Sequence, residues 1–455
     1  MTTAVLPRGP RGNFISGNLP AFKKDWLGFV THVAREFGDI VQLRFGPKPV
    51  VLLSHPDYVE YVLVTNNRNF TKDFTLRLYK VILGNGLLTS EGDFWLRQRR
   101  MIQPAFQKQR IASFGQTMVS YTERMLANWN DGAVIDIHAH FMQLALEIAA
   151  KTLFDADVAA DAHDVGVALE TALASINNRF NSLFWLPGWL PTPNNLQLRR
   201  AVRRLDDVLY RIIDERRKRG EDRGDLLSLL LQARDEDGSC MTDQQLRDEA
   251  MTLFLAGHET TALALSWTCY LLGQHPEVVA DLETELATVL GGRSPAAEDY
   301  SRLRYTERVV MESMRLYPPA FGIGREAIQD CEIAGYPISA GMPLFFHQWV
   351  IHRDPRFFTD PEQFLPDRWA DGLAQRLPKY AYFPFGGGPR LCIGNTFAMM
   401  EITLIVATLV QRFHLELTPG QENLAPELKV SLRPKGGVWV KPVERVPAAA
   451  IGAPT

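Results

Sequence analysis

A short run near the C-terminal end of the chain constrains the fold more than any other feature. It places one cysteine, Cys392, among glycines, an arginine and a phenylalanine, in the order Phe-Gly-Gly-Gly-Pro-Arg-Leu-Cys-Ile-Gly. Gly388 and Gly394 have no Cβ, so the backbone beside the cysteine can approach a flat surface closely. The residues after Gly394 are apolar at helical spacing, which predicts a helix from Asn395 to Phe413. Cys392 would then precede a helix N-terminus, where free N–H groups and the helix dipole favour a thiolate.

The composition excludes several classes of protein. With 46% hydrophobic residues among 455, the chain can build one large core or two fused lobes. A formal net charge of −3 gives no electrostatic footprint for nucleic acid. The four cysteines lack the paired spacing of a zinc site or a disulfide scaffold, which fits a reducing compartment. They are Cys240, Cys269, Cys331 and Cys392.

The ends of the chain differ from its middle. Residues 1–20 are rich in Pro and Gly and contain no apolar run long enough for a signal peptide or a membrane anchor. We therefore expect a soluble, cytoplasmic protein and a monomer. Residues 21–441 show no linker or internal repeat, which predicts a single domain. Residues 442–455 are rich in Pro and Ala without periodicity, which predicts a disordered tail.

The pattern along the chain is mainly helical with a small β-rich lobe. Alternating apolar residues over 38–54, with a break at Gly46-Pro47, predict a β-hairpin. Short strand-like pieces return between Glu326 and Pro343, separated by glycine and proline. Residues 351–390 carry many prolines and aromatics with little regular pattern, which predicts a long irregular segment.

The longest helical signal runs from Met241 to Gln274. Thr242 and Gln245 form a capping-box pattern at its start, and the later part is apolar all round, as in a buried helix. Inside this part, Glu259 and Thr260 place a carboxylate and a hydroxyl in a dry setting, where polar groups need a partner or a function. The plain alternative is that Thr260 bonds to the carbonyl one turn earlier in its own helix.

These segments resemble the cytochrome P450 family, and the motifs occur in the family's order. The Phe-x-x-Gly-x-Arg-x-Cys-x-Gly run is similar to the family's haem-ligand loop, and Ala-Gly-His-Glu-Thr-Thr over 256–261 to its Ala/Gly-Gly-x-Asp/Glu-Thr motif. Glu-x-x-Arg over 312–315, with Pro-Asp-Arg over 366–368, resembles the family's Glu-x-x-Arg helix and Pro-x-Arg loop. Trp-x-x-x-Arg over 95–99 resembles a helix that binds haem propionates.

The resemblance implies the cytochrome P450 fold, a triangular prism of helices around a buried haem, with an irregular segment before the haem loop. It implies thiolate-ligated haem b, with Cys392 as the iron ligand. Glu259 would take part in proton delivery, and Thr260 would hydrogen-bond dioxygen. The implied haem-binding residues are Trp95, Arg99, Ala256, Gly257, Arg325, Phe385, Arg390, Cys392 and Gly394.

The resemblance also implies a structural ion network of Glu312, Arg315 and Arg368. An apolar substrate pocket would be lined by Leu88, Ala256, Ala320, Phe321 and Leu432, with the aromatic stretch 180–189 as a lid. The alternative for each lining residue is ordinary core packing.

The implied activity is a monooxygenase that inserts one oxygen atom from O2 into a lipophilic molecule, with fatty acids first and terpenoids or macrolides next. Electrons would come from a separate ferredoxin or flavodoxin with its reductase. Arg97, Arg100, Lys108 and Arg110 would dock this partner or form a solvated face. A haem-thiolate peroxygenase or isomerase, and a non-enzymatic haem sensor or electron carrier, are the alternatives.

Overall fold

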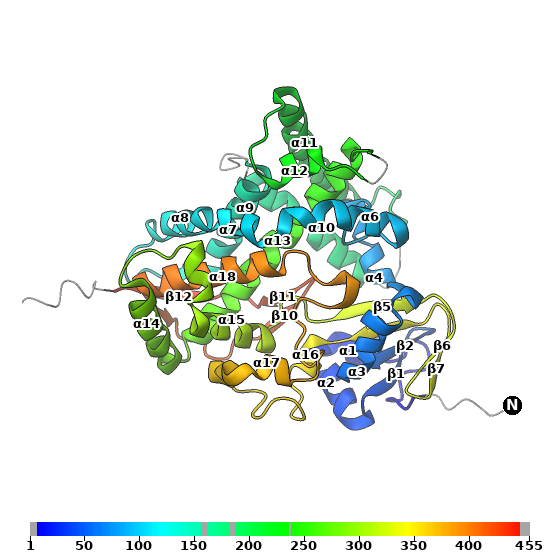
Figure 1. Ribbon diagram of the computed structural model, residues 1–455. Helices are drawn as coiled ribbons and strands as arrows, with labels where there is room; N and C mark the ends of the chain where they lie inside the picture. Colours follow the sequence, from blue (N-terminus) through cyan, green and yellow to red (C-terminus); the bar gives the residue numbers. More distant parts are fainter. Residues whose placement is uncertain (1–6, 156–161, 182–186, 236–237, 446–455) are drawn as a thin grey trace, which may run out of the picture. The chain divides into compact units, whose positions relative to one another are not determined.

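The computed structural model describes residues 7–155, 162–181, 187–235 and 238–445. The chain divides into two compact units, and each combines two stretches that lie far apart in the sequence. The first unit consists of Met1–Arg77 and Met311–Cys392, and the second of Leu78–Val310 and Ile393–Thr455. Each unit has at least one hydrophobic cluster of its own. Figure 1 labels the helices and strands of both units. The prediction of one domain over 21–441 stays a prediction.

A five-stranded sheet lies in the first unit, in the order β1-β2-β8-β5-β3. Its strands are β1 (Ile40–Phe45), β2 (Lys48–Leu53), β3 (Phe70–Lys72), β5 (Ile323–Ala327) and β8 (Pro343–Phe346). β2 and β8 run parallel, and the other neighbours are antiparallel. The hairpin of β1 and β2 confirms the prediction for residues 38–54, and Gly46 in its turn has φ +61°.

Both faces of this sheet are covered at β2. Successive side chains of a strand point to opposite faces. Val50 and Leu52 join a cluster with helix α2 (Trp26–Phe37), whereas Val51 and Leu53 join a cluster that includes residues of β5 and β8. A strand buried on both faces is a continuous apolar run, which is what the sequence of β2 shows after its first two residues.

The rest of the first unit is short elements and coil. These elements are α1 (Leu19–Lys24), α3 (Pro56–Glu60), a π-helical turn at Tyr61–Thr65, α4 (Phe74–Arg77), β6 (Cys331–Ile333), β7 (Tyr336–Ile338), α16 (Gln348–Ile351) and α17 (Leu373–Arg376). Between residues 352 and 391, the described backbone adds only the 3₁₀ stretches Pro366–Gly372 and Gly388–Arg390 to α17. This confirms the predicted irregular segment.

The second unit is mainly helical. Its helices are α5 (Lys80–Leu83), α6 (Gly92–Ile102), α7 (Lys108–Ser113), α8 (Gly115–Leu126), α9 (Ile137–Phe154), α10 (Ala162–Asn181), α11 (Pro193–Arg219), α12 (Leu226–Gln232), α13 (Asp243–Leu272), α14 (Pro276–Leu290) and α18 (Asn395–Arg412), with 3₁₀ stretches at Gln103–Phe106 and Ala297–Ser301. Helix α15 (Arg304–Leu316) begins in this unit and ends in the first.

Two small antiparallel sheets complete the second unit. β4 (Ile135–Asp136), β12 (Trp439–Glu444) and β9 (Phe413–Leu417) form one, and β10 (Pro426–Leu428) and β11 (Leu432–Pro434) form the other. The sequence predicted a disordered tail from residue 442, but β12 continues to Glu444 because its backbone pairs with β9. Residues 446–455 of that tail lie outside the described residues.

Helix α13 confirms the long helix predicted for Met241–Gln274. Thr242 caps its start: the Thr242 hydroxyl accepts from the N–H of Gln245, and the Gln245 side chain accepts from the N–H of Thr242. The helix ends before Gly273 because Pro276 begins the next helix. It packs against α9, α11 and α18, so it is covered on several sides.

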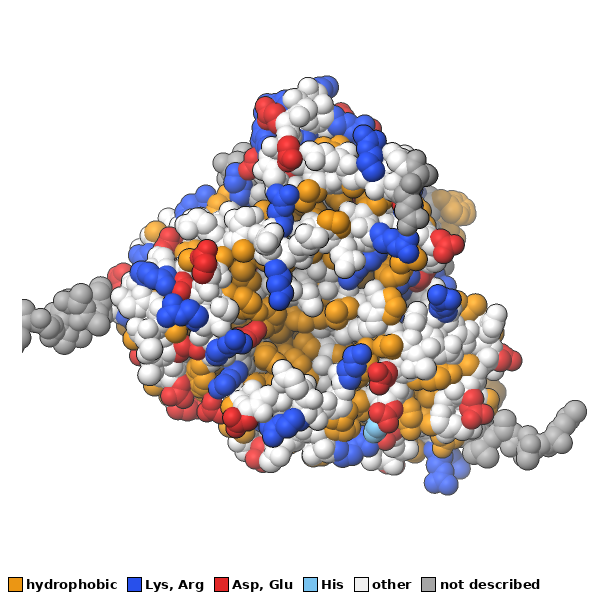
Figure 2. Space-filling view, in the orientation of Figure 1, with side chains coloured by type: hydrophobic (Ala, Val, Ile, Leu, Met, Phe, Trp, Pro, Cys, Tyr) orange, Lys and Arg blue, Asp and Glu red, His pale blue; other side chains and the backbone are white. Residues whose placement is uncertain are grey.

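The surface carries mixed charges. In the upper part of Figure 2, over α11, basic side chains lie among acidic ones. The sequence of α11 explains this, since it combines many arginines with aspartate and glutamate. In the described part of the chain, every helix is too short or too polar to cross a lipid bilayer.

Candidate functional site

The loop before Cys392 in the first unit is a tight turn. The backbone N–H of Cys392 donates to the carbonyl of Phe385 at 3.0 Å, which closes the loop. Gly388 has φ +62°, and a Cβ there would overlap the carbonyl oxygen of Leu63. From the sequence, we expected the missing Cβ of Gly388 to allow close approach to a flat surface. In the structure, the missing Cβ instead makes room for the backbone of Leu63, in the same unit. Of the four cysteines, Cys392 is the exposed one.

In the second unit, helix α13 has a short stretch that other elements do not cover completely. From Leu246 to Leu272, every residue of this helix is buried except Ala256, Gly257 and Thr260. These three positions are spaced i, i+1 and i+4, so they lie on one face of the helix. A strip of small side chains is therefore open in the middle of a buried helix.

Glu259 and Thr260 have different surroundings on this helix. Thr260 is exposed, and its hydroxyl donates to the carbonyl of Ala256 at 2.5 Å, as the plain alternative expected. Its oxygen can still accept a hydrogen bond. Glu259 is buried, and its Oε1 accepts from the Ser431 hydroxyl at 2.5 Å and from the Arg433 guanidinium at 2.6 and 2.9 Å. The sequence did not identify Ser431 and Arg433 as partners of Glu259, because they lie in a short polar segment that resembles an ordinary surface hairpin.

A second buried carboxylate lies on α18. Glu401 is 1% exposed, and its Oε2 accepts from the hydroxyl of Thr261 at 3.3 Å. Burial raises the pKa of Glu401 to about 8, and the Thr261 hydrogen bond opposes that rise. This carboxyl is therefore protonated at neutral pH. The sequence contains one indication of this site, because Glu401 is the single acidic residue of the long apolar helix α18.

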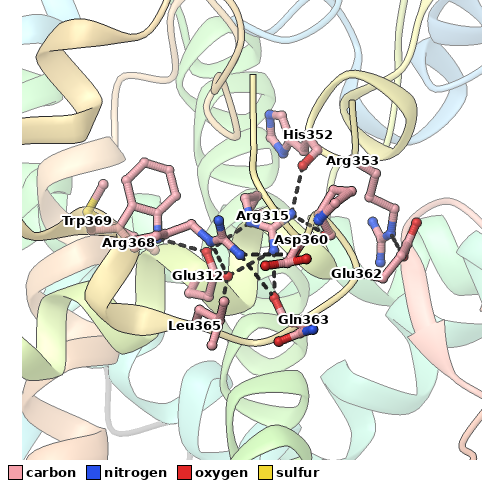
Figure 3. A network of polar contacts seen from close by, with 12 residues as sticks. Glu312, Arg315, His352, Arg353, Asp360, Glu362, Gln363, Leu365, Arg368 and Trp369 are labelled. Carbon is pink, nitrogen blue, oxygen red and sulfur yellow. Dashed lines mark hydrogen bonds and ion pairs between the residues drawn. The ribbon is translucent and has the colours of Figure 1, made fainter. Parts of the chain in front are cut away.

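The structure brings Glu312, Arg315 and Arg368 together in the first unit (Figure 3). Glu312 accepts from Arg315 at 2.8 and 2.9 Å and from Arg368 at 2.8 Å. It also accepts from the indole of Trp369 at 2.9 Å and from the N–H of Leu365 at 3.0 Å. The sequence had not assigned these last two donors.

Arg315 connects this network to the irregular segment. Its fully buried guanidinium donates to the carbonyls of His352 and Gln363 at 2.8 and 2.9 Å (Figure 3). It also donates to the carbonyl of Pro361 at 2.6 Å. Three backbone carbonyls of the irregular segment are thus held by one side chain, whose charge is balanced by Glu312.

The four predicted propionate-binding residues come from both units. Trp95 and Arg99 lie one turn apart on α6 of the second unit, with Trp95 buried and Arg99 half-buried. Arg325 on β5 and the half-buried Arg390 belong to the first unit. The Arg325 guanidinium donates to the carbonyl of Gly324 at 2.8 Å.

The predicted pocket residues are placed unequally. Leu88 is 40% exposed and Ala320 is exposed, whereas Leu432 is completely buried. Phe321 is half-buried and packs edge-on against Trp26, with ring centroids 4.5 Å apart. Leu88 and Ala320 are therefore accessible to solvent, whereas Leu432 has the surroundings of a core residue.

The loop that carries Leu88 is fixed to α13. The carboxylate of Asp248 accepts from the N–H of Asn85 at 2.8 Å, and Glu249 accepts from the N–H of Leu87 at 2.9 Å. A Cβ on Gly86 would overlap the side-chain oxygen of Thr252. These anchors on α13 were not found in the sequence.

Two further predictions are placed only in part. Of the proposed lid, the side chains of residues 180–186 lie outside the described residues, and Trp189 is 73% exposed. Of the basic cluster, Arg97 pairs with Asp235, and Arg110 donates to the carbonyl of Gly224 at 3.0 Å. Lys108 is exposed at the start of α7.

Comparison with known proteins identifies the family. A family model described as Cytochrome P450 matches residues 7–440, so the chain belongs to the cytochrome P450 family. It is accordingly an oxidoreductase of the monooxygenase type. Proteins of this family use a haem-thiolate cofactor, a redox partner and a lipophilic substrate.

Individual relatives are similar over most of their length. Cyclooctatin synthase of Streptomyces melanosporofaciens is 37% identical over 96% of this chain and 94% of its own. Cyclooctat-9-en-7-ol 5-monooxygenase of the same organism is 38% identical, covering 84% of each chain. Pentalenene oxygenase of Streptomyces avermitilis is 37% identical, covering 84% and 85%. The structure of retinoic acid bound cyanobacterial CYP120A1 matches with a TM-score of 0.87 at 29% identity, covering 98% of this chain and 100% of that one.

Proposed function

We propose that this protein oxidises a terpenoid by inserting one oxygen atom from O2, through hydroxylation or epoxidation. The names of the three Streptomyces relatives refer to cyclooctatin, cyclooctat-9-en-7-ol and pentalenene, which are terpenoid compounds. This similarity carries the choice of substrate class. Fatty acids, which the sequence placed first, become the second candidate, and macrolides the third.

We propose haem b as the cofactor, with the Cys392 thiolate as its iron ligand. The bound haem would supply the activation of O2, for which a thiolate ligand favours O–O cleavage. An exposed thiol in a closed loop fits this role, since a ligand must be accessible and held in place. The small residues Ala256 and Gly257 fit a flat group, because neither position carries a side chain larger than a methyl group.

The remaining proposed contacts follow from charge and geometry. The two haem carboxylates would be held by indole and guanidinium donors. These donors are Trp95, Arg99, Arg325 and Arg390, while Phe385 and Gly394 complete the cysteine loop.

Glu259 and Thr260 would handle the protons that O2 reduction consumes. Thr260 presents its hydroxyl on the open strip of α13, and Glu259 adds an ionisable group beside it in the chain. A hydroxyl can accept one proton while donating another, so it can pass a proton on without changing its charge.

The test is a titration of the purified ferric protein with ligands, followed by optical absorption. The panel contains cyclic terpene hydrocarbons and alcohols, retinoic acid, fatty acids and macrolides. A shift from low to high spin with the terpenes alone supports the proposal, because it reports displacement of a water ligand. A shift confined to fatty acids or macrolides replaces the proposed substrate class, and a spectrum without thiolate ligation overturns the role of Cys392.

We also propose a separate acidic ferredoxin or flavodoxin as the electron donor, with Lys108 in its docking surface. Lys108 is exposed, whereas Arg97 and Arg110 are engaged within the protein. Lys108→Glu should slow reduction by such a partner most at low ionic strength. Lys435→Glu, at an exposed position on the turn after β11, is the charge-matched control. Equal reduction rates in both variants would exclude this docking surface.

A further inference from the structure

Residues 8–18 run along the outer edge of β1 in the first unit. The N–H of Gln42 donates to the carbonyl of Arg8 at 3.1 Å, and the N–H of Asn18 donates to the carbonyl of Arg44 at 2.7 Å. The side-chain oxygen of Asn18 accepts from the N–H of Arg44 at 2.8 Å. Because β1 is the last strand on its side of the sheet, these bonds satisfy backbone groups that would otherwise be unpaired.

A tight turn from Asn13 to Gly17 lies within this edge segment. The backbones of Asn13 and Gly17 exchange two hydrogen bonds, at 2.8 and 2.9 Å. Arg44 holds the turn from β1, because its guanidinium donates to the carbonyl of Phe14 at 2.8 Å and to that of Asn13. Gly17 has φ +62°, and a Cβ there would overlap the carbonyl oxygen of Arg44. The conformation of the turn is therefore fixed by the sheet.

The two side chains at the tip of this turn are apolar and exposed. Phe14 is 93% exposed and Ile15 is 83% exposed, the highest fractions among the large hydrophobic side chains in the described part of the chain. Single exposed apolar side chains are common, but here two adjacent ones are kept in water by a turn that the sheet holds. Their transfer to an apolar environment would be favourable. We call these two residues the Phe14–Ile15 tip.

The polypeptide that carries the tip is basic. Residues 1–24 and 40–54 contain no Asp or Glu. The turn between β1 and β2 lies beside the tip, because the N–H of Gly46 donates to the carbonyl of Ser16 at 3.1 Å. The next acidic residue along the chain, Asp25, caps α2 by accepting from the N–H of Gly28 at 3.0 Å. The exposed cations of the two stretches are Arg8, Arg11, Lys23, Lys24 and Lys48.

This combination of features fits a lipid surface better than a protein partner. Two side chains can bury only a few hundred Å², whereas a stable protein interface buries about 1,200–2,000 Å² in total. A fluid bilayer can take up single apolar side chains, and anionic headgroups above its hydrocarbon attract Lys and Arg. An apolar tip on a basic, acid-free stretch is complementary to such a surface in both respects.

We propose that the Phe14–Ile15 tip inserts into the surface of an anionic lipid bilayer, with the neighbouring cations against the headgroups. The contact is peripheral, since the tip reaches only the boundary between headgroups and acyl chains. Lipophilic molecules concentrate in bilayers, so an enzyme held there meets such substrates at a higher concentration than in water. The inference goes beyond the proposed function, because the contact does not depend on which substrate is oxidised.

The first experiment sediments the purified holoenzyme with vesicles made of equal parts phosphatidylglycerol and phosphatidylcholine. Phe14→Ser/Ile15→Ser should lower the partition coefficient at least about tenfold, because the inserted apolar surface is lost. Val134→Ser/Ile328→Ser is the matched control, since it removes two side chains that are 53% and 52% exposed elsewhere. It should leave the partition coefficient unchanged. Equal partition of the wild type and the Phe14→Ser/Ile15→Ser variant overturns the inference.

A second comparison tests the charges. Arg11→Gln/Lys48→Gln should lower partition into the anionic vesicles at least about fivefold. Lys218→Gln/Lys435→Gln, at two exposed positions of the second unit, should have little effect. Salt at about 1 M should also weaken binding, because the Debye length falls to about 3 Å. Equally strong binding of the wild type to vesicles of phosphatidylcholine alone contradicts an anionic surface.

A third measurement locates the tip directly. In Phe14→Trp, fluorescence should be quenched by lipids that carry bromine on their acyl chains, beyond the quenching seen in the wild type. Quenching equal to that of the wild type contradicts insertion. Sedimentation of the protein without vesicles separates the remaining possibility: a change of oligomeric state in Phe14→Ser/Ile15→Ser would make the tip an interface between copies of this chain. The haem absorption spectrum of each variant checks that the fold is retained.

Discussion

Thr260 and Thr261 are adjacent in the sequence, yet their hydroxyl groups lie in different surroundings. Thr260 is exposed and bonds within its own helix, whereas Thr261 is buried and bonds to Glu401. Adjacent residues of a helix point about 100° apart, so one can serve chemistry while the other serves packing. The pair therefore provides an internal comparison of these two roles.

Thr260→Ala should increase the fraction of consumed O2 that is released as hydrogen peroxide, because the variant lacks the hydroxyl that we propose passes protons on. Product formation, peroxide and reductant consumption are measured together. Thr261→Ala is the control: it should lower the free energy of unfolding by about 1 kcal/mol through loss of a buried hydrogen bond, with peroxide release unchanged. Equal peroxide release in the wild type and Thr260→Ala contradicts the role of Thr260, and would favour an electron carrier.

Glu401 should make stability depend on pH. Its pKa is raised from 4.5 in an ordinary environment to about 8, so between these values the folded state binds a proton that the unfolded state has released. The free energy of unfolding should fall as pH rises through this range, by at most about 1.4 kcal/mol per pH unit. Denaturant unfolding compares the wild type with Glu401→Gln, which should lack this contribution. Parallel pH profiles would show that Glu401 is ionised inside the fold.

At the scale of elements, short-range sequence patterns predicted helix α13 and the hairpin of β1 and β2. The start of α13 was predictable because Thr242 and Gln245 satisfy each other's backbone groups within four residues. The hairpin of β1 and β2 was predictable from alternation around Gly46-Pro47. These patterns depend only on neighbours in the sequence, so the sequence contains all that determines them.

Long-range contacts were not predictable in the same way. Arg433 and Glu259 are 174 positions apart, and an arginine in a short polar hairpin resembles a solvated one. The anchoring of Leu87 by Glu249 was missed for the same reason. The motif of the cysteine loop was recognisable, but the physical reason for Gly388 was not, because Leu63 comes from a distant turn.

The cysteine loop should not tolerate a side chain at residue 388. In Gly388→Ala, the alanine would have to adopt the positive φ of +62°, and its Cβ would overlap the carbonyl oxygen of Leu63. Gly46→Ala is the matched control: it has φ +61° with open space around it, so it should cost only about 1–2 kcal/mol in the free energy of unfolding. A larger loss in Gly388→Ala, with reduced haem incorporation, is expected from denaturation and absorption measurements. Equal losses would show that the loop moves away from Leu63 easily.

At the scale of the whole molecule, the Glu312 network fixes a long coil that has little regular hydrogen bonding of its own. Five donors meet on this carboxylate, and Arg315 extends the network to three backbone carbonyls. The order of the irregular segment thus depends on a few charged side chains rather than on a helix or strand. The sequence indicated the triad through its motifs, but not the backbone carbonyls that it holds.

Glu312→Gln should lower the free energy of unfolding by about 3–5 kcal/mol, because it leaves the buried Arg315 without its counter-charge. Denaturant unfolding measures the change. Asp164→Asn, which removes an exposed ion pair with Arg204, should change it by less than about 1 kcal/mol. A comparably small effect at Glu312 would mean that the carbonyls alone satisfy Arg315.

The division of the chain into two interleaved units has a consequence for synthesis on the ribosome. Residues up to Arg77 must wait for Met311–Cys392, and the second unit is finished only by the stretch that starts at Ile393. Glu259 leaves the ribosome long before Arg433, so a growing chain carries this carboxylate without its cation. Neither unit can fold completely until its second stretch has been synthesised, which happens only after part of the other unit. Premature termination before residue 433 would leave the carboxylate of Glu259, at the centre of α13, without Arg433.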